Sequence, residues 1–93
     1  MVSPLTRIRV VVHGGVQGVG FRWYVRDAAE NLGLSGWVRN RWNGTVEIEA
    51  EGAKEDLARF EELLMSGPGN PARVESIETG SAVPKGEKGF TII

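Results

Sequence analysis

A glycine-rich stretch at residues 14–22 carries the residue types best suited to chemistry in this sequence. It reads Gly-Gly-Val-Gln-Gly-Val-Gly-Phe-Arg, so four of its nine residues are glycine. Glycine lets a ligand approach the main chain closely, and such a loop at the start of a helix can direct several N–H groups toward one anion. Arg22 ends the stretch, and a guanidinium can hold two phosphate oxygens while keeping its charge. The stretch therefore predicts an oxyanion cradle, with phosphate as the expected ligand.

Two better-known glycine motifs do not fit this stretch. A nucleotide P-loop ends in Gly-Lys-Ser or Gly-Lys-Thr, and neither is present here. A dinucleotide fingerprint that began at Gly18 would need a glycine where Trp23 stands, and it would also need a parallel βαβ unit. What remains is an anion site without a lysine, a metal or a nucleophilic side chain.

Such a site suits a substrate that already carries a good leaving group. Hydrolysis of an ordinary phosphate monoester needs strong help for a poor leaving group. An acyl phosphate instead releases a carboxylate, a group with a pKa of about 4, so no general acid is required. Positioning and charge stabilisation could supply most of the acceleration. Asn40 is the best candidate to hold the attacking water, because its side-chain amide both donates and accepts hydrogen bonds.

The composition of the 93 residues excludes several kinds of chemistry. The absence of cysteine rules out disulfides, thiolate catalysis and the common structural zinc sites. The single histidine, His13, rules out a histidine-rich metal site within one chain. We therefore expect neither a metal nor a cofactor. Eleven basic and twelve acidic residues give a net charge of −1, which does not favour nonspecific binding to nucleic acid.

Length and hydropathy give the expected organisation. Ninety-three residues suit one domain, so residues 1–93 are expected to form a single unit. The first seven residues lack the apolar segment of a signal peptide, and no stretch is long and apolar enough to span a membrane. We expect a cytoplasmic monomer that acts on a small molecule, without a nucleic-acid or membrane partner.

Hydrophobic periodicity predicts the elements that must position the candidate residues. Alternation is typical of strands, and a period of about 3.6 residues is typical of helices. Strands are expected at residues 5–13, 35–42, 45–51, 72–79 and 89–93, and helices at residues 21–32 and 53–66. The order β-α-β-β-α-β with a terminal strand predicts an α+β, ferredoxin-like sandwich. In it, two helices cover one face of an antiparallel sheet, and the last strand is a short edge strand.

Four local features of these elements can be predicted as well. Asn43-Gly44 between two strands indicates a type I′ hairpin turn. The spacing of Val74 and Ile77 breaks strict alternation and indicates a β-bulge. The glutamates at 47, 49 and 51 lie opposite the apolar face of their strand, and a solvated face is the favoured interpretation over a metal cluster. His13 is likewise expected to lie on the exposed face of the sheet.

The sequence resembles the acylphosphatase family nearly from end to end. The resemblance rests on Val-Gln-Gly-Val-Gly-Phe-Arg at 16–22, Gly-Trp-Val-Arg-Asn at 36–40 and Asn-Gly-Thr-Val-Glu at 43–47. Leu-Gly-Leu at 32–34, Gly-Pro at 67–68, Ala-Arg-Val at 72–74 and Gly-Phe at 89–90 also fit. The loop motif together with the second block, at matching separation, is a specific signal.

The resemblance implies a metal-independent hydrolase that splits acyl phosphates into a carboxylate and inorganic phosphate. By the residue match, Arg22 would bind the phosphate, Asn40 would position the nucleophilic water, and Thr45 would support the site. The backbone cradle would be formed by Gly15, Val16, Gln17, Gly18, Val19, Gly20 and Phe21. Inorganic phosphate would then be a product or an inhibitor. Gly15 occupies a position that often holds a larger residue, and Asn43 stands where aspartate is frequent.

Two other functions remain open from the sequence. Ferredoxin-like sheets can bind RNA through exposed aromatic residues, but the third strand presents glutamates and no matching aromatic pattern. Domains resembling acylphosphatases also occur fused to larger proteins in carbamoyl-transfer assemblies. The fold alone does not decide among these functions, whereas the loop and Asn40 favour the hydrolase.

Overall fold

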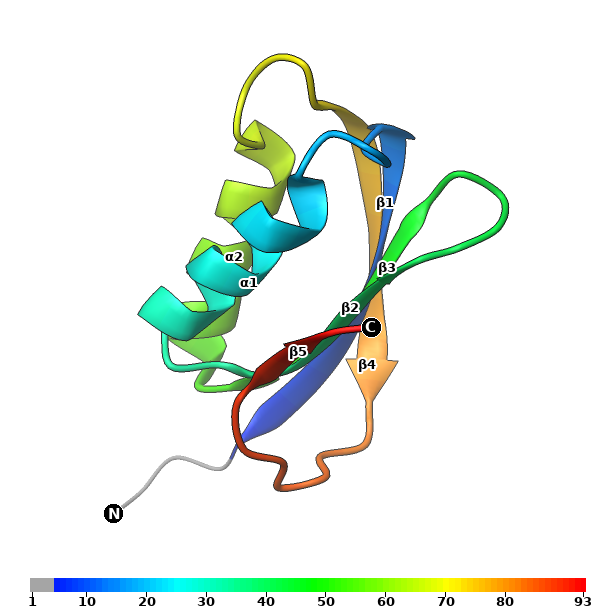
Figure 1. Cartoon of the computed structure of the whole chain (residues 1–93). Coiled ribbons are helices and arrows are strands. Elements are labelled where there is room, and N and C mark those ends of the chain that lie inside the picture. The colour runs from blue at the N-terminus through cyan, green and yellow to red at the C-terminus, as the bar shows by residue number, and fades with distance from the viewer. Residues whose placement is uncertain (1–4) are drawn as a thin grey trace.

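The computed structural model describes residues 5–93 and shows a two-layer α+β sandwich (Figure 1). Five strands form one sheet in the order β4-β1-β3-β2-β5, and both helices pack on the same face of it. The elements are β1 (Thr6–Gly15), α1 (Phe21–Asn31), β2 (Ser35–Asn40), β3 (Val46–Gly52), α2 (Lys54–Ser66), β4 (Arg73–Ala82) and β5 (Phe90–Ile92). The predicted ferredoxin-like fold is confirmed. Within the described residues, neither helix is long and apolar enough to cross a membrane.

The sheet is mixed, and this corrects the predicted antiparallel sheet at one edge. The pairs β1–β3, β1–β4 and β2–β3 are antiparallel, but β2 and β5 run parallel, with Gly36 opposite Phe90. The chain reverses direction after β4 and crosses to the other edge of the sheet, where β2 already runs antiparallel to β4. β5 therefore takes the direction of β2, and it forms the expected edge strand.

The core lies between the helices and one face of the sheet. Phe21 and Val25 of α1 and Phe60 and Leu64 of α2 are almost fully buried, as their helical spacing predicted. The Phe90 ring of β5 meets the Phe60 ring edge to face, with ring centroids 6.4 Å apart. Burial of these side chains fixes both helices, and with them the start of α1, against the sheet.

The predicted bulge is present, but the predicted turn type is wrong. His13 pairs with Ser76 and Gly14 pairs with Val74, so Glu75 is an extra residue in β4. In the β2–β3 hairpin only Gly44 has a positive φ, of 92°, whereas a type I′ turn requires positive φ at two positions. The Asn43 side chain instead accepts a hydrogen bond from the Thr45 N–H, at 3.2 Å. This Asx-type contact competes with the left-handed conformation that the type I′ turn would need.

The second face of β3 is not the solvated acidic face that the sequence predicted. Glu47 and Glu51 are only 4% and 2% exposed. Arg9 and Arg39 each donate to Glu47, at 2.6 Å and 2.7 Å from their Nε atoms. Arg7 pairs with Glu51, and the segment after β4 covers this end of the face. The pattern within β3 does not reveal this pairing, because Arg9 comes from β1 and Arg39 comes from β2.

Candidate active site

The loop between β1 and α1, where the sequence predicts a cradle, has main-chain N–H groups without backbone partners among residues 5–93. Gly18 and Gly20 have φ of 73° and 77°, the left-handed region that favours glycine. A Cβ atom at either position would meet no atom within 4 Å, so backbone conformation rather than crowding selects glycine there. Within residues 5–93, the N–H groups of residues 17–20 donate to no backbone acceptor. Alternating conformations of this kind leave N–H groups free to converge on an anion.

The N-terminus of α1, which follows the loop directly, is also favourable for an anion. Gly20 is the N-cap of α1, no side chain caps this end, and the first turn contains no acidic residue. The first N–H groups of a helix have no partner within the helix, and its dipole places partial positive charge there. The first turn of α1 therefore contains no acidic side chain that would repel a bound anion.

Arg22 lies in the first turn of α1 and lines the same pocket as the loop. Its guanidinium forms no salt bridge with an acidic side chain of residues 5–93. Its Nη1 donates instead to the main-chain oxygen of Ile93, at 3.0 Å. A cation beside the positive end of a helix is electrostatically unfavourable unless an anion binds there. Arg22 therefore lines the pocket with no acidic side chain of residues 5–93 paired to it, and its role in binding an anion stays a prediction.

Asn40 ends β2 and opens onto this pocket. The pocket has a volume of about 110 Å³ and is lined by Val16, Gly18, Gly20, Phe21, Arg22, Trp23 and Asn40. The side-chain Oδ1 of Asn40 is buried and has no hydrogen-bond partner among the described residues. A buried acceptor without a partner is costly, and it suits a bound water. The structure thus brings Asn40 and Arg22 to one pocket, as the split βαβ arrangement suggested.

Gln17 has a role that the sequence did not reveal. Its side-chain Nε2 donates to the main-chain oxygens of Arg41, at 2.6 Å, and Thr45, at 2.9 Å. These two oxygens belong to the connection between β2 and β3, which follows Asn40 directly. Gln17 therefore connects the loop after β1 to the hairpin whose first strand ends at Asn40. An amide with two donors in an otherwise apolar and glycine-rich loop is the sequence signal that could have indicated this role.

Four of the predicted site residues are not in the lining of this pocket: Gly15, Gln17, Val19 and Thr45. Gly15 is the last residue of β1 and pairs with Arg73 of β4. Thr45 is buried, and its Oγ1 donates to Asn43 Oδ1 at 2.7 Å. Both residues line a neighbouring, more open hollow of about 370 Å³. Thr45 contacts Asn43 in the hairpin turn, and its main-chain oxygen accepts from Gln17. The cradle roles of residues 15–21 and the roles of Arg22 and Asn40 stay predictions.

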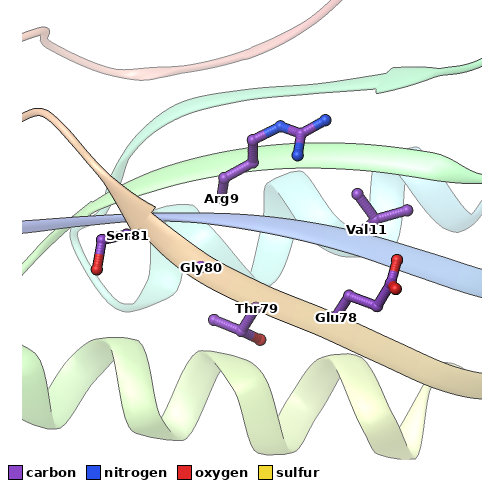
Figure 2. A pocket seen from close by; sticks show the side chains of 6 residues that line it. All are labelled: Arg9, Val11, Glu78, Thr79, Gly80 and Ser81. Atoms are coloured by element: carbon purple, nitrogen blue, oxygen red, sulfur yellow. The ribbon is translucent and has the colours of Figure 1, made fainter.

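The open face of the sheet has a separate hollow, and both charged side chains that line it are paired. Figure 2 shows this hollow between β1 and β4, with a volume of about 320 Å³. Arg9 on its rim pairs with Glu47, and Glu78 pairs with His13 at 2.9 Å. The hydrogen bond from His13 lowers the pKa of the Glu78 carboxyl. His13 is partly exposed on this face, as predicted, and residues 5–93 contain no cluster of acidic or histidine side chains able to hold a metal.

A glycine-rich loop at a helix start, carried by a split βαβ sandwich, places the chain among the small α+β proteins with a ferredoxin-like fold. Comparison with known proteins narrows this class to one family. The family model for acylphosphatase matches residues 8–92. The chain belongs to the acylphosphatase family, which confirms the resemblance found in the sequence and the prediction of an acylphosphatase-type hydrolase.

Individual relatives agree with this assignment. An acylphosphatase of Methanospirillum hungatei JF-1 is 40% identical over 88 residues, which cover 95% of this chain and 97% of that protein. The crystal structure of acylphosphatase from Bacillus subtilis matches with a TM-score of 0.90 and 40% identity, over 97% of this chain and 99% of that one. A full-length HypF in its phosphate- and nucleotide-bound form matches with a TM-score of 0.88 and 27% identity, over 100% of this chain but 12% of that one.

Proposed function

We propose that this acylphosphatase binds the phosphoryl group of an acyl phosphate in the loop after β1 and cleaves its carboxyl–phosphate bond with a water held by Asn40. The observation that carries the proposal is the shared pocket. Arg22 and Asn40 line the same volume of about 110 Å³. Among residues 5–93, Arg22 forms no salt bridge with an acidic side chain and the buried Oδ1 of Asn40 has no hydrogen-bond partner. One group supplies positive charge for the phosphoryl oxygens, and the other supplies an acceptor for a water proton.

Each part of the reaction can be assigned to a group. The loop N–H groups and Arg22 stabilise the charge on the phosphoryl oxygens as the transition state forms. The water oxygen attacks phosphorus in line with the leaving carboxylate, and the bond between phosphorus and the carboxyl oxygen breaks. Because the leaving carboxylate is a weak base, it departs with its electron pair and needs no proton. The water proton passes to a phosphoryl oxygen of the substrate, since Asn40 orients water without ionising.

The proposal also covers the expected inhibitor, oligomeric state, location and partners of the protein. Inorganic phosphate, as the product, is expected to compete with the substrate for the cradle. The protein is expected to act as a cytoplasmic monomer on a small molecule. RNA binding through the sheet is disfavoured, because Arg7, Arg9 and Arg39 on its open face are paired with glutamates.

The likeness to HypF favours a second candidate function. A domain of this fold could release phosphate from carbamoyl phosphate within a larger carbamoyl-transfer assembly, as HypF-like fusions suggest. This chain spans only 12% of that HypF chain. It is 40% identical to the Bacillus subtilis acylphosphatase and 27% identical to that HypF, which favours the hydrolase. A comparison of carbamoyl phosphate with benzoyl phosphate as substrates discriminates the two, since the second function requires a strong preference for the carbamoyl compound.

The test of the main proposal is turnover of benzoyl phosphate in the presence of EDTA, with no added metal. The purified protein should exceed the spontaneous rate by several orders of magnitude. Arg22→Ala should lose both turnover and the binding of inorganic phosphate, measured by calorimetry. Asn40→Ala should lose turnover by about a hundredfold or more while its phosphate affinity stays near that of the unsubstituted protein. An equal loss of phosphate affinity in Asn40→Ala would contradict the division of roles.

A further inference from the structure

The lining of the pocket joins the proposed phosphate site to an exposed side chain. Gly18, Gly20, Arg22 and Asn40 line it together with Trp23. In an acyl phosphate the acyl group is bonded to the phosphoryl group through one oxygen atom. When the phosphoryl group lies against the loop and Arg22, the acyl group therefore meets the exposed side chains that line the same pocket.

Trp23 is the exposed apolar side chain in the pocket lining. Val16 and Phe21 are each only 1% exposed, and Gly18 and Gly20 have no side chains, whereas Trp23 is 57% exposed. Its indole follows Arg22 directly in the first turn of α1. Among the residues that line this pocket, Trp23 offers the apolar surface that an acyl group can contact.

The indole of Trp23 is held in place before a substrate binds. The guanidinium carbon of Arg26, three residues further along α1, lies 4.2 Å from the centroid of the Trp23 ring. Arg26 Nε is buried and has no hydrogen-bond partner in the described part of the chain, and its acidic neighbours are no closer than 3.7 Å. This cation–π contact orders the ring, so a ligand that packs against the indole gives up less conformational entropy.

We propose that Trp23 is a specificity-determining residue, whose indole contacts the acyl group and favours acyl phosphates with flat, apolar acyl groups such as benzoyl. This inference rests on the proposed function of the pocket. An aromatic acyl group packed against indole gains the energy of an aromatic pair, which a methyl group cannot match. The substrate class expected is therefore aromatic acyl phosphates rather than acetyl phosphate.

The test compares benzoyl phosphate with acetyl phosphate in the unsubstituted protein, in Trp23→Ala and in Trp23→Phe. The measured quantity is the ratio of kcat/KM for benzoyl phosphate to that for acetyl phosphate. Trp23→Ala should lower this ratio about three- to tenfold, the effect of one aromatic contact. Trp23→Phe keeps a flat ring and should retain most of the preference. Circular dichroism shows whether each variant is folded.

Trp42 provides a matched control. It is the same residue type, it is 98% exposed in the β2–β3 hairpin, and it does not line the pocket. Trp42→Ala should leave the ratio and both individual rates unchanged. An unchanged ratio in Trp23→Ala would overturn the proposal. So would an equal fall in the ratio for Trp42→Ala, because the preference would then arise outside the pocket.

A binding measurement separates this proposal from the proposed function. If the unsubstituted protein hydrolyses neither substrate, the proposed function fails. The stable analogues benzoylphosphonate and acetylphosphonate then report on Trp23 through their dissociation constants, measured by calorimetry. Tighter binding of the benzoyl compound that Trp23→Ala removes supports the role of Trp23. Equal binding of the two analogues by the unsubstituted protein overturns it.

Discussion

The guanidinium of Arg22 donates a hydrogen bond of 3.0 Å to the main-chain oxygen of Ile93, 71 residues further along the chain. The N–H of Ile93 in turn donates to the main-chain oxygen of Val38, at 2.9 Å. Val38 lies two residues before Asn40 on β2. Ile93 therefore links the arginine of α1 to the strand that carries the asparagine, and it fixes the two proposed catalytic side chains relative to each other.

This linkage predicts that a positive charge alone at position 22 is insufficient. A lysine cannot hold the Ile93 oxygen and two phosphate oxygens with one planar group. Arg22→Lys should therefore weaken phosphate binding about tenfold, and less severely than Arg22→Ala. Isothermal calorimetry with inorganic phosphate measures the effect. Arg59→Lys, on the exposed face of α2, is the matched control and should bind phosphate normally; an Arg22→Lys variant with normal affinity would contradict the prediction.

The side chain of Gln17 is predicted to position Asn40. Gln17→Leu removes both hydrogen bonds to the hairpin and leaves the Arg41 and Thr45 oxygens without this donor. We expect a loss of about 1–3 kcal/mol in the free energy of unfolding, from two lost hydrogen bonds. We also expect kcat to fall more than phosphate affinity, because the water site on Asn40 moves while the cradle keeps its N–H groups.

Urea unfolding and steady-state kinetics measure these two effects. Thr91→Val is a suitable control, because Thr91 is an exposed polar residue of β5 that does not line the pocket. Its kcat should be unchanged. If Gln17→Leu loses phosphate affinity and kcat in equal proportion, Gln17 shapes the cradle itself rather than the position of Asn40.

Local patterns predicted the fold well because each helix and strand buries one side of its own sequence. Phe21, Val25 and Phe60 are buried as their spacing indicated, and the bulge beside Val74 is where alternation fails. Helix ends also followed local signals, since Gly33 is left-handed, with φ of 69°. The family could be predicted because the motif blocks that contain Arg22 and Asn40 are specific.

Features that depend on two distant segments were missed. The buried state of Glu47 depends on arginines from β1 and β2, and periodicity within β3 carries no information about them. The parallel pairing of β5 and the contact between Gln17 and the hairpin are likewise set by tertiary arrangement. A strand pattern states which side faces the core, but it does not state what covers the other side.

Gly18 is predicted to be required for its backbone conformation. With φ of 73°, an alanine there would cost about 1–2 kcal/mol or would shift the loop. Gly18→Ala should therefore lower both the free energy of unfolding and phosphate affinity. Gly80→Ala is the matched control, because Gly80 in β4 has no left-handed φ and open space around its Cα. Thermal unfolding of both variants, with and without phosphate, measures their stability and their phosphate binding. Equal effects of Gly18→Ala and Gly80→Ala would show that the backbone conformation of Gly18 is not what the substitution disturbs.

The buried carboxylate of Glu51 predicts a loss of stability in acid. The N–H of Lys85 donates to the Glu51 carboxylate at 2.7 Å, and this bond lowers the pKa of the Glu51 carboxyl. Burial alone would raise this pKa, but the hydrogen bonds from the Gly86 N–H and from Arg7 lower it further. Because the folded pKa lies below the unfolded value of about 4.3, ionised Glu51 stabilises the protein above that pH. This contribution is lost as the pH falls from about 5 toward the lowered pKa.

Glu51→Gln tests this expectation. The variant should be less stable than the unsubstituted protein at pH 7, because Arg7 loses a charged partner in a buried site. The difference in the free energy of unfolding between the two proteins should shrink as the pH falls below about 5, because Glu51 in the unfolded chain takes up a proton before the folded carboxylate does. Glu62→Gln, which alters an exposed pair with Arg59 at 3.8 Å, should change stability little at any pH. A difference for Glu51→Gln that stays constant down to pH 3 would show that the carboxylate charge contributes nothing to holding the segment after β4 against the sheet.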